Sequence, residues 1–255
     1  MIEVQDLKKR FKLTWKMKRE LGKAASNGYV DAVDGISFTC QPGRIFSLLG
    51  PNGAGKTTTL RMIATMLKPT AGTVKVAGFD VTRQPLEVRR RMGFLTGTTK
   101  LYDRLTPNEL TRYYAELYGM DKDRYEQRRD EIFTRLGIHE FANRRIGKLS
   151  SGMQQKVSIA RTIIHDPEVV VFDEPTAGLD VISARTIIEL IREFREAGKT
   201  VIFSTHIMGD VSLLSDDLAI IHKGKLRYCG SYQDFVNNMQ TKSLEDEFIR
   251  LTEED

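Results

Sequence analysis

The sequence has no long apolar run. Its longest aliphatic stretches, such as Val169 to Phe172, contain about four residues, whereas a helix that crosses a bilayer needs roughly 18 or more. The first ten residues, MIEVQDLKKR, alternate apolar and polar side chains and include no apolar stretch of the secretory type. We therefore expect a cytoplasmic protein that does not itself span a membrane.

Cysteine is scarce, and so is any sign of repetition. Cys40 and Cys229 are the only two cysteines among 255 residues, and they lack metal-like spacing, so the sequence indicates neither a disulfide framework nor a zinc site. Repeats with periods of about 20 to 50 residues, low-complexity tracts and Pro/Gly/Ser linkers are also absent. These absences predict one chain-length module.

No charge of one sign dominates the composition. The 39 Lys and Arg residues exceed the 34 Asp and Glu residues only slightly, so we expect no nucleic-acid partner. Eight Lys or Arg residues lie between Lys8 and Lys23, whereas residues 245–255 are mainly acidic. The segment from Lys12 to Lys23 is either a solvated loop or a contact for anionic lipid, where each cation contributes on the order of 1 kcal/mol.

Strand-like and helical patterns alternate along the chain. Apolar residues recur at helical spacing from Leu60 to Leu67 and from Ile187 to Phe194. Short apolar runs rich in β-branched residues are typical of parallel strands buried on both faces. The alternation predicts an α/β fold with a doubly wound sheet. The predicted strands are Ile45 to Leu49, Val169 to Phe172, Val201 to Phe203 and Leu218 to Ile221.

A helical segment interrupts this alternation between about Pro107 and Arg145, where apolar residues keep helical spacing without a strand between them. We predict a helical subdomain over about residues 97–158, inserted into a sheet core of about residues 1–96 and 159–255. The last part of the chain adds a hairpin turn at Lys223-Gly224-Lys225 and a helix with Leu244, Phe248 and Leu251 on one face.

The strongest local signal is GPNGAGKT at residues 50–57, a match to the phosphate-loop pattern G-x-x-x-x-G-K-[ST] between an apolar strand and an amphipathic helix. Its glycines let the backbone curve so closely that successive N–H groups and the helix N-terminus can hold phosphate oxygens. Lys56 is expected to reach the β- and γ-phosphates, and the Thr57 hydroxyl to ligate the Mg²⁺ that bridges them. The predicted phosphate-binding residues are Gly50, Pro51, Asn52, Gly53, Ala54, Gly55, Lys56, Thr57 and Thr58.

Two acidic residues follow the predicted strand that ends at Phe172. Asp173 is expected to supply the second protein oxygen for magnesium, as a phosphate-loop architecture requires. Glu174 would then lie beside the metal and the γ-phosphate, where a carboxylate can orient or deprotonate the attacking water. The alternative is an exposed acidic pair in a turn before Pro175.

Together with three further segments, these residues resemble the ATP-binding cassette (ABC) ATPases. The resemblance covers nearly the whole chain apart from about residues 12–27. It implies a magnesium-dependent ATPase with a RecA-like mixed sheet core, a small antiparallel β part and an inserted helical subdomain. The further segments are LSSGMQQK at Leu149 to Lys156, AGLD at Ala177 to Asp180 and STH at Ser204 to His206.

The resemblance also implies a head-to-tail homodimer in which each subunit completes the ATP site of the other. Ser150 and Gly152 of one subunit would contact the γ-phosphate held by the phosphate loop of the other; a hydroxyl, an N–H group and a helix N-terminus suit that anion. Asp180 would contact the opposite subunit, and His206 would hold the γ-phosphate and the attacking water. Taken alone, His206 is more typical of a strand-end histidine with a local hydrogen bond.

The sequence departs from the family pattern at two places. The signature segment usually reads LSGGQ, but Ser151 and Met153 stand at two of those positions, and we expect them to tune the phosphate contact rather than abolish it. A loop that commonly carries a glutamine reaching the metal and water has Gly97 instead, so that Thr98 or Thr99 would have to supply an oxygen. Gly97 therefore bears on the rate of hydrolysis more than on nucleotide binding.

The run GFLTGTTKLYDRLTPNE and the ending SLEDEFIRLTEED are similar to the sodium-efflux subgroup of these ATPases, which works with a separate membrane permease. The resemblance implies a subunit on the cytoplasmic face of the membrane that powers export, with sodium as the cargo by analogy. The permease is expected to dock between core and helical subdomain, near residues 97–115. Phe11 is expected to stack on adenine, with Tyr29 as the rival.

Two other functions fit parts of the sequence. A soluble ABC ATPase of DNA repair would carry a long coiled coil, but only about 90 residues separate Thr58 from Leu149, and the second cassette of translation-type members is absent. An ATP-gated scaffold with negligible turnover is the other alternative, motivated by Gly97.

Overall fold

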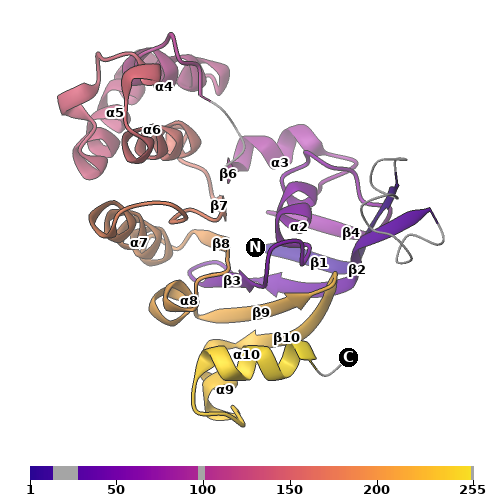
Figure 1. The fold of residues 1–255 in the computed structure, drawn as a ribbon. Helices are drawn as coiled ribbons and strands as arrows, with labels where there is room; N and C mark the ends of the chain where they lie inside the picture. The colour runs from indigo at the N-terminus through magenta and orange to yellow at the C-terminus, as the bar shows by residue number, and fades with distance from the viewer. Residues whose placement is uncertain (14–27, 97–100, 254–255) are drawn as a thin grey trace.

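The computed structural model describes residues 1–13, 28–96 and 101–253. The basic segment from Lys12 to Lys23 therefore lies mostly outside the described residues, and so do Gly97, Thr98 and Thr99. Two sheets pack against each other, and a helical lobe lies to one side of them (Figure 1). Within the described ranges, no helix combines the length and the apolar character that a bilayer crossing demands.

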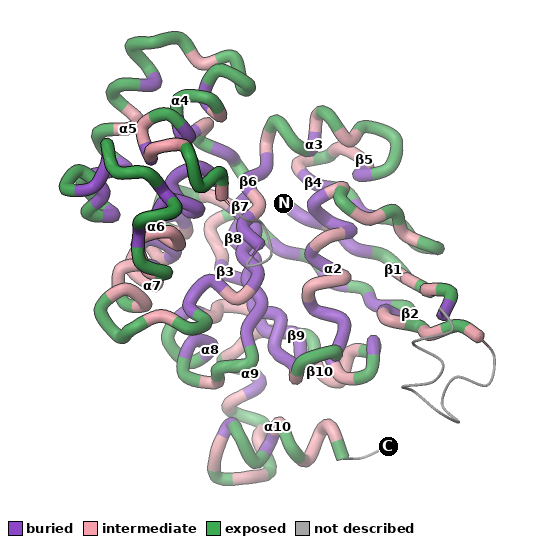
Figure 2. The backbone as a smooth tube through the Cα atoms, turned by 45° about the horizontal axis from the view of Figure 1, so that its top comes forward, coloured by how far each residue is buried: buried purple, intermediate pink, exposed green. Residues whose placement is uncertain are grey.

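A six-stranded sheet forms the centre of the molecule. Its strands are β3 (Ile45–Leu49), β6 (Met92–Thr96), β7 (Val169–Asp173), β8 (Thr200–Thr205), β9 (Asp217–His222) and β10 (Lys225–Ser231). They lie in the order β10-β9-β3-β8-β7-β6, all parallel except β10. Every residue of β3, β7 and β8 is buried because both faces are covered, as Figure 2 shows, which confirms the predicted buried strands.

A four-stranded antiparallel sheet covers one face of the central sheet. Its order is β2-β1-β4-β5, from β1 (Ile2–Lys12), β2 (Tyr29–Cys40), β4 (Ala71–Val76) and β5 (Phe79–Asp80). The rings of Phe38 on β2 and Phe46 on β3 stack with centroids 4.9 Å apart, which joins the two sheets. Antiparallel strands need only one buried face, and their alternating patterns are weaker sequence signals than the apolar runs of the central sheet. The predicted α/β class with a small antiparallel part is confirmed.

Helices cover the remaining faces of the central sheet and form the lobe. Helix α2 (Lys56–Ile63) packs in the apolar cluster between the two sheets, and α7 (Val181–Glu196) covers the opposite face through Phe194, whose ring stacks on Phe172. Helix α3 (Pro85–Arg91) leads into β6, and α8 (Met208–Leu214) follows β8.

The lobe consists of α4 (Pro107–Leu117), α5 (Lys122–Leu136), the short 3-10 helices η2 (His139–Phe141) and η3 (Ile146–Lys148), and α6 (Ser151–Ile163) (Figure 1). Helix α4 begins with a capping box, in which Thr106 and Glu109 bond each other's backbone N–H groups. Helix α6 continues without interruption across residue 158 and packs on β6. The division of the chain at residues 97 and 158 therefore stays a prediction.

The end of the chain folds as predicted. Lys223 and Gly224 have φ values of 45° and 78° and join β9 to β10 by a tight hairpin. Helices α9 (Tyr232–Asn237) and α10 (Leu244–Glu253) pack on β9, with Leu244, Phe248 and Leu251 in the same apolar cluster.

Candidate active site

The phosphate loop connects β3 to α2 and is shaped by its glycines. Gly53 and Gly55 have φ values of 81° and 111°, in a region that residues with a side chain rarely adopt. A Cβ on Gly50 would lie 2.3 Å from the carbonyl oxygen of Ile221, and one on Gly55 would lie 2.5 Å from that of Ala32. Only glycine fits these two positions, so the loop can lie directly against neighbouring backbone.

Lys56, the first residue of α2, points back into this loop. Its side chain is only 4% exposed, and its ammonium donates to the carbonyl oxygens of Gly50 at 2.7 Å and Pro51 at 3.2 Å. Glu174 Oε1 lies 3.4 Å from the same nitrogen. Burial lowers the pKa of Lys56, and the Glu174 carboxylate opposes that shift by raising it. A buried cation beside inward-facing backbone is suited to hold an anion such as a phosphate.

Oxygen donors gather beside the loop at the end of β7. Asp173, which is 6% exposed, accepts hydrogen bonds at Oδ1 from Thr57 Oγ1 at 2.9 Å and from Ser204 Oγ at 2.7 Å. In the part of the chain that the structure describes, no three His, Cys, Asp or Glu side chains form a metal cage. A hydroxyl and one carboxylate nevertheless fit a magnesium ion whose remaining ligands are phosphate oxygens and water.

Glu174 and His206 meet at the ends of two adjacent parallel strands. Asp173 pairs with Ser204 across β7 and β8, so the residues that follow each strand emerge side by side. His206 Nδ1 lies 3.2 Å from Glu174 Oε1. Glu174 has a φ of 51°, a conformation that costs a non-glycine residue of order 1 kcal/mol, and its N–H donates to the Ser204 carbonyl at 3.1 Å. The structure thus brings together Lys56, Glu174 and His206, the three predicted catalytic residues.

The predicted signature residues do not line the phosphate-loop hollow. Ser150 is the N-cap of α6 and accepts from the Met153 N–H at 3.3 Å. A Cβ on Gly152 would lie 3.4 Å from Ser183 Oγ and 3.8 Å from Asp180 Oδ2. The hollow at the phosphate loop is lined by Ala32, residues 51–58 and Glu174, none of which belongs to α6.

The two aromatic candidates for stacking on adenine lie on the antiparallel sheet. Phe11 of β1 pairs with Val30 of β2, and Tyr29 is the adjacent residue, half exposed. Neither lines the phosphate-loop hollow, but Ala32, three residues after Tyr29, does. The choice between Phe11 and Tyr29 stays a prediction.

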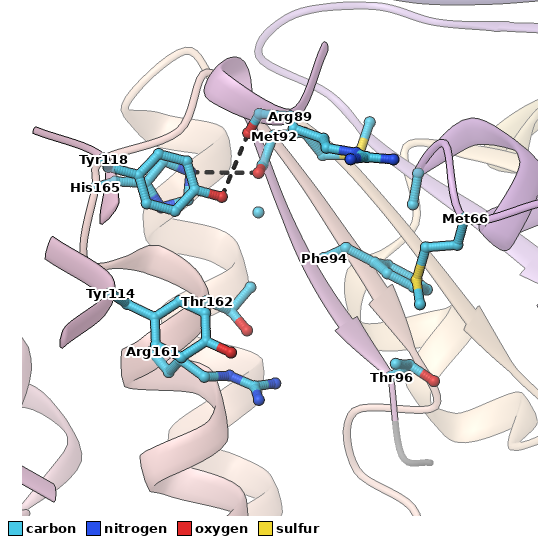
Figure 3. A pocket seen from close by; sticks show the side chains of 12 residues that line it. Met66, Arg89, Met92, Phe94, Thr96, Tyr114, Tyr118, Arg161, Thr162 and His165 are labelled. Atoms are coloured by element: carbon cyan, nitrogen blue, oxygen red, sulfur yellow. Dashed lines mark hydrogen bonds between the residues drawn. The ribbon is translucent and has the colours of Figure 1, made fainter. Parts of the chain in front are cut away.

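A second hollow of about 250 Å³ lies between the core and the lobe (Figure 3). On the lobe side, the rings of Tyr118 and His165 stack with centroids 3.6 Å apart and an angle of 5° between them. Tyr118 Oη donates to the Arg89 carbonyl at 3.4 Å, and His165 Nε2 lies 3.2 Å from the Met92 carbonyl, so the stacked pair ties the lobe to the core. The hollow is lined by Ala64, Met66, Arg89, Met92, Gly93, Phe94, Thr96, Tyr114, Tyr118, Arg161, Thr162 and His165.

The ABC transporter family matches the chain over residues 33–177, which is more than half of it. The chain belongs to the ABC transporter family. The resemblance seen in the motifs is thereby confirmed, and as a member of this family the chain is an ATPase subunit.

Individual relatives agree with this assignment. The ABC transporter ATP-binding protein NatA of Bacillus subtilis (strain 168) is 43% identical over 216 residues, which cover 84% of this chain and 88% of NatA. Among solved structures, an ATP-binding subunit of an ABC transporter superposes with a TM-score of 0.85 at 26% identity over 98% of this chain and 99% of its own. A dimeric structure of MJ0796, a bacterial ABC transporter cassette, gives 0.78 at 25% identity over 91% and 98%.

Three residues of this ABC ATPase site were not singled out from the sequence. Ser204 bonds the Asp173 carboxylate, and its place as the first letter of the STH segment was the available signal. Thr176, two residues after Glu174, and Asp210, four residues after His206, bond each other although they are 34 residues apart in the chain. No spacing rule predicts such a pair, because only the sheet brings the two segments together.

The partly buried His165 of the second hollow is expected to make the stability of this ABC subunit depend on pH. Burial lowers the pKa of His165 to about 4, whereas an unfolded histidine titrates near ~6.5. Between these values the unfolded chain binds a proton that the folded chain excludes, so stability falls as pH drops from 6.5 toward 4. At pH 5 the loss is about 2 kcal/mol.

The measurement is the free energy of unfolding in urea at pH 7 and pH 5 for the wild type and H165N. H165N is expected to reduce the difference between the two pH values by about 2 kcal/mol. An unchanged difference would show that His165 is not its source.

Proposed function

We propose that this chain is the ATP-hydrolysing motor of a transporter and that it works as a head-to-tail pair on the cytoplasmic face of a membrane permease. The observation that carries the proposal is the position of Glu174, whose carboxylate lies 3.4 Å from the Lys56 ammonium and 3.2 Å from the His206 ring. The Lys56 ammonium, the Glu174 carboxylate and the His206 ring thus meet at the ends of two parallel strands, beside the loop that would hold a γ-phosphate.

The proposed reaction uses the chain's own groups in sequence. Loop N–H groups and Lys56 hold the β- and γ-phosphates of ATP, and Glu174 accepts a proton from a water molecule that attacks the γ-phosphorus in line. The bond from that phosphorus to the bridging oxygen breaks, and ADP and phosphate are the products. Thr57 and Asp173 would hold Mg²⁺, which neutralises developing charge on the phosphate oxygens. His206 orients Glu174 through its Nδ1 side.

A second copy of the chain completes the proposed site. Ser150 and Gly152 are separate from the phosphate-loop hollow within one chain, although a hydroxyl and a helix N-terminus suit a γ-phosphate. Val181 and Ile182, at the start of α7 close to Asp180, are 84% and 79% exposed. Two neighbouring large apolar side chains exposed to this degree favour an interface at this end of the molecule. ATP would close the pair because its γ-phosphate contacts both copies, whereas ADP would not.

The proposed docking site for the permease is the hollow between core and lobe. Met66, which lines it, is 60% exposed. Leu86, on the same helix as the lining residue Arg89, and Leu117, next to the lining residue Tyr118, are 66% and 63% exposed. Arg161 projects into the space between the two walls (Figure 3) and is only 6% exposed, yet among the described residues its partners are the Ser158 hydroxyl at 3.2 Å and the face of Tyr114. A buried guanidinium without a carboxylate favours a partner that brings one.

The proposed partner segment is therefore a short cytoplasmic stretch of the permease with an Asp or Glu flanked by apolar side chains. Similarity to the sodium-efflux subgroup makes sodium the first ion to test in vesicles that contain both subunits. The Lys12 end of the basic segment, at the tip of β1, would face the headgroups if that segment contacts lipid.

The first test of the proposed function is phosphate release by the wild type and by E174Q. Loss of the base is expected to lower kcat at least 100-fold, since general-base catalysis contributes about 10²–10⁴-fold. ATP binding should persist, so E174Q with ATP and Mg²⁺ should run as a dimer in light scattering, whereas the wild type with ADP should run as a monomer. E126Q, on the exposed face of α5, is the matched control and should retain wild-type turnover.

Equal background rates in the wild type and E174Q would favour the ATP-gated scaffold instead. A monomer under every nucleotide condition would contradict the shared site.

The second test concerns the docking site. R161M keeps the stem of the side chain but removes the charge, and R89E reverses the charge of an exposed arginine on the opposite wall. Both are expected to lower copurification with the permease by about tenfold or more, because R161M removes one partner of a buried charge pair and R89E repels an acidic partner at the rim. The control R144E, at an exposed lobe position, should copurify like the wild type. Full copurification of both R161M and R89E would remove the electrostatic basis of the docking proposal.

A further inference from the structure

Asp210 is a buried carboxylate that none of the site motifs includes. It lies in the first turn of α8, four residues after His206, and is 7% exposed. Its Oδ2 accepts hydrogen bonds from Thr176 Oγ1 at 2.5 Å and from Thr205 Oγ1 at 3.4 Å. Throughout the described ranges, no lysine, arginine or histidine forms an ion pair with it.

The chemistry of these partners determines where their protons lie. An ionised carboxylate can only accept, so both threonine hydroxyls must donate to Asp210. Charge-assisted O–H···O⁻ bonds are short and strong, and 2.5 Å for Thr176 is at the short end of that range. Removing a carboxylate from water costs several kcal/mol, so a buried one with only hydroxyl partners is expensive for the fold. The position of this costly carboxylate between the loops that carry Glu174 and His206 indicates a functional role.

Thr176 connects Asp210 to the loop that carries Glu174. It follows Glu174 by two residues, and the Ala177 N–H closes a turn back to the Glu174 carbonyl at 3.3 Å. From the lobe, Gln155 Nε2 donates to the Pro175 carbonyl at 3.0 Å. The segment that positions Glu174 is thus held by α6 on one side and by Asp210 on the other.

Thr205 connects the same carboxylate to the loop that carries His206. While its hydroxyl donates to Asp210, its oxygen accepts the Ile207 N–H at 2.9 Å. These two bonds bracket His206, because they restrain the residue before it and the residue after it. His206 in turn lies 3.2 Å from Glu174 through its Nδ1.

We propose that Asp210 is a positioning residue: by holding Thr176 and Thr205 at once, it keeps the Glu174 carboxylate and the His206 ring in the mutual register that water activation needs. The inference rests on the proposed roles of Glu174 and His206. Asp210 contacts no reacting atom, and its effect passes through the two threonines.

The variants that test this are T176V, which removes one hydroxyl at constant shape, T176S, which keeps it, and D210N, which keeps the shape but removes the charge. T111V is the matched control, because Thr111 is also a buried threonine and bonds a carbonyl, that of Pro107 at 2.9 Å, within the lobe. For each variant we would measure kcat and KM for ATP, the melting temperature, and amide hydrogen exchange over residues 174–180 and at Ile207.

T176V and D210N are expected to lower kcat by about tenfold or more with KM changed less than about threefold, and T176S should restore most of the rate. The double variant should lose little more than either single one, because both break the same link. Amide exchange at Ile207 should rise in D210N. T111V should lower the melting temperature but leave kcat within about twofold.

The proposal is overturned if T176V and D210N behave like T111V, with a lower melting temperature, wild-type kcat and unchanged exchange at Ile207. Failure of the proposed hydrolysis looks different, since the wild type would then release no more phosphate than E174Q. In that case hydrogen exchange alone decides whether Asp210 holds the two loops.

Discussion

Backbone hydrogen bonding among three buried parallel strands, β3, β8 and β7, is the constraint on which the whole site depends. Leu49 pairs with Thr205, and Asp173 pairs with Ser204, so the three strands end at the same edge of the sheet and at the same level. The loop after β3 can then curve around the Lys56 ammonium, within reach of the Glu174 carboxylate that follows β7. A slip of one residue in any of these pairings would turn its side chains to the opposite face of the sheet.

The site combines buried charges with a large number of hydroxyl partners. Asp173 is bonded by Thr57 and Ser204, and Asp210 by Thr176 and Thr205, whereas Lys56 has carbonyl oxygens and Glu174. Hydroxyl groups can donate or accept, so they satisfy these charges without neutralising them. A charge that is hydrogen-bonded but not neutralised can still interact with a bound nucleotide or its metal ion, whereas two fully paired ions would interact with it only weakly.

The lobe is joined to the core by contacts of a different kind. The Tyr118–His165 stack, the apolar surface of α6 and the hydrogen bond from Gln155 to the Pro175 carbonyl connect it to β6 and to the loop after β7. The last of these contacts links the signature helix directly to the segment of Glu174. Movement of the lobe relative to the core would therefore displace the segment that carries Glu174 through a short chain of contacts. A transporter ATPase needs coupling of this kind.

Prediction from the sequence succeeded where a signal was local. The phosphate loop, the acidic end of β7 and the hairpin after β9 depend on residues that are adjacent in the chain, and their glycines and apolar runs reveal them. The strand predicted at Val201 to Phe203 was too short: β8 runs from Thr200 to Thr205, because Ser204 and Thr205 are buried by tertiary contacts that hydropathy does not register.

By itself, then, the sequence determined which groups are present: a glycine-rich loop before a helix, two carboxylates at the end of a buried strand, and a helical insertion between them. Only the tertiary structure decided which of these groups meet, because Glu174, His206 and Asp210 come together through strand register. It also decided that Ser150 and Gly152 lie apart from the loop within one chain. The physical reason is that side-chain identity is encoded residue by residue, whereas proximity across a sheet depends on hydrogen-bond pairing and packing between segments far apart in the chain.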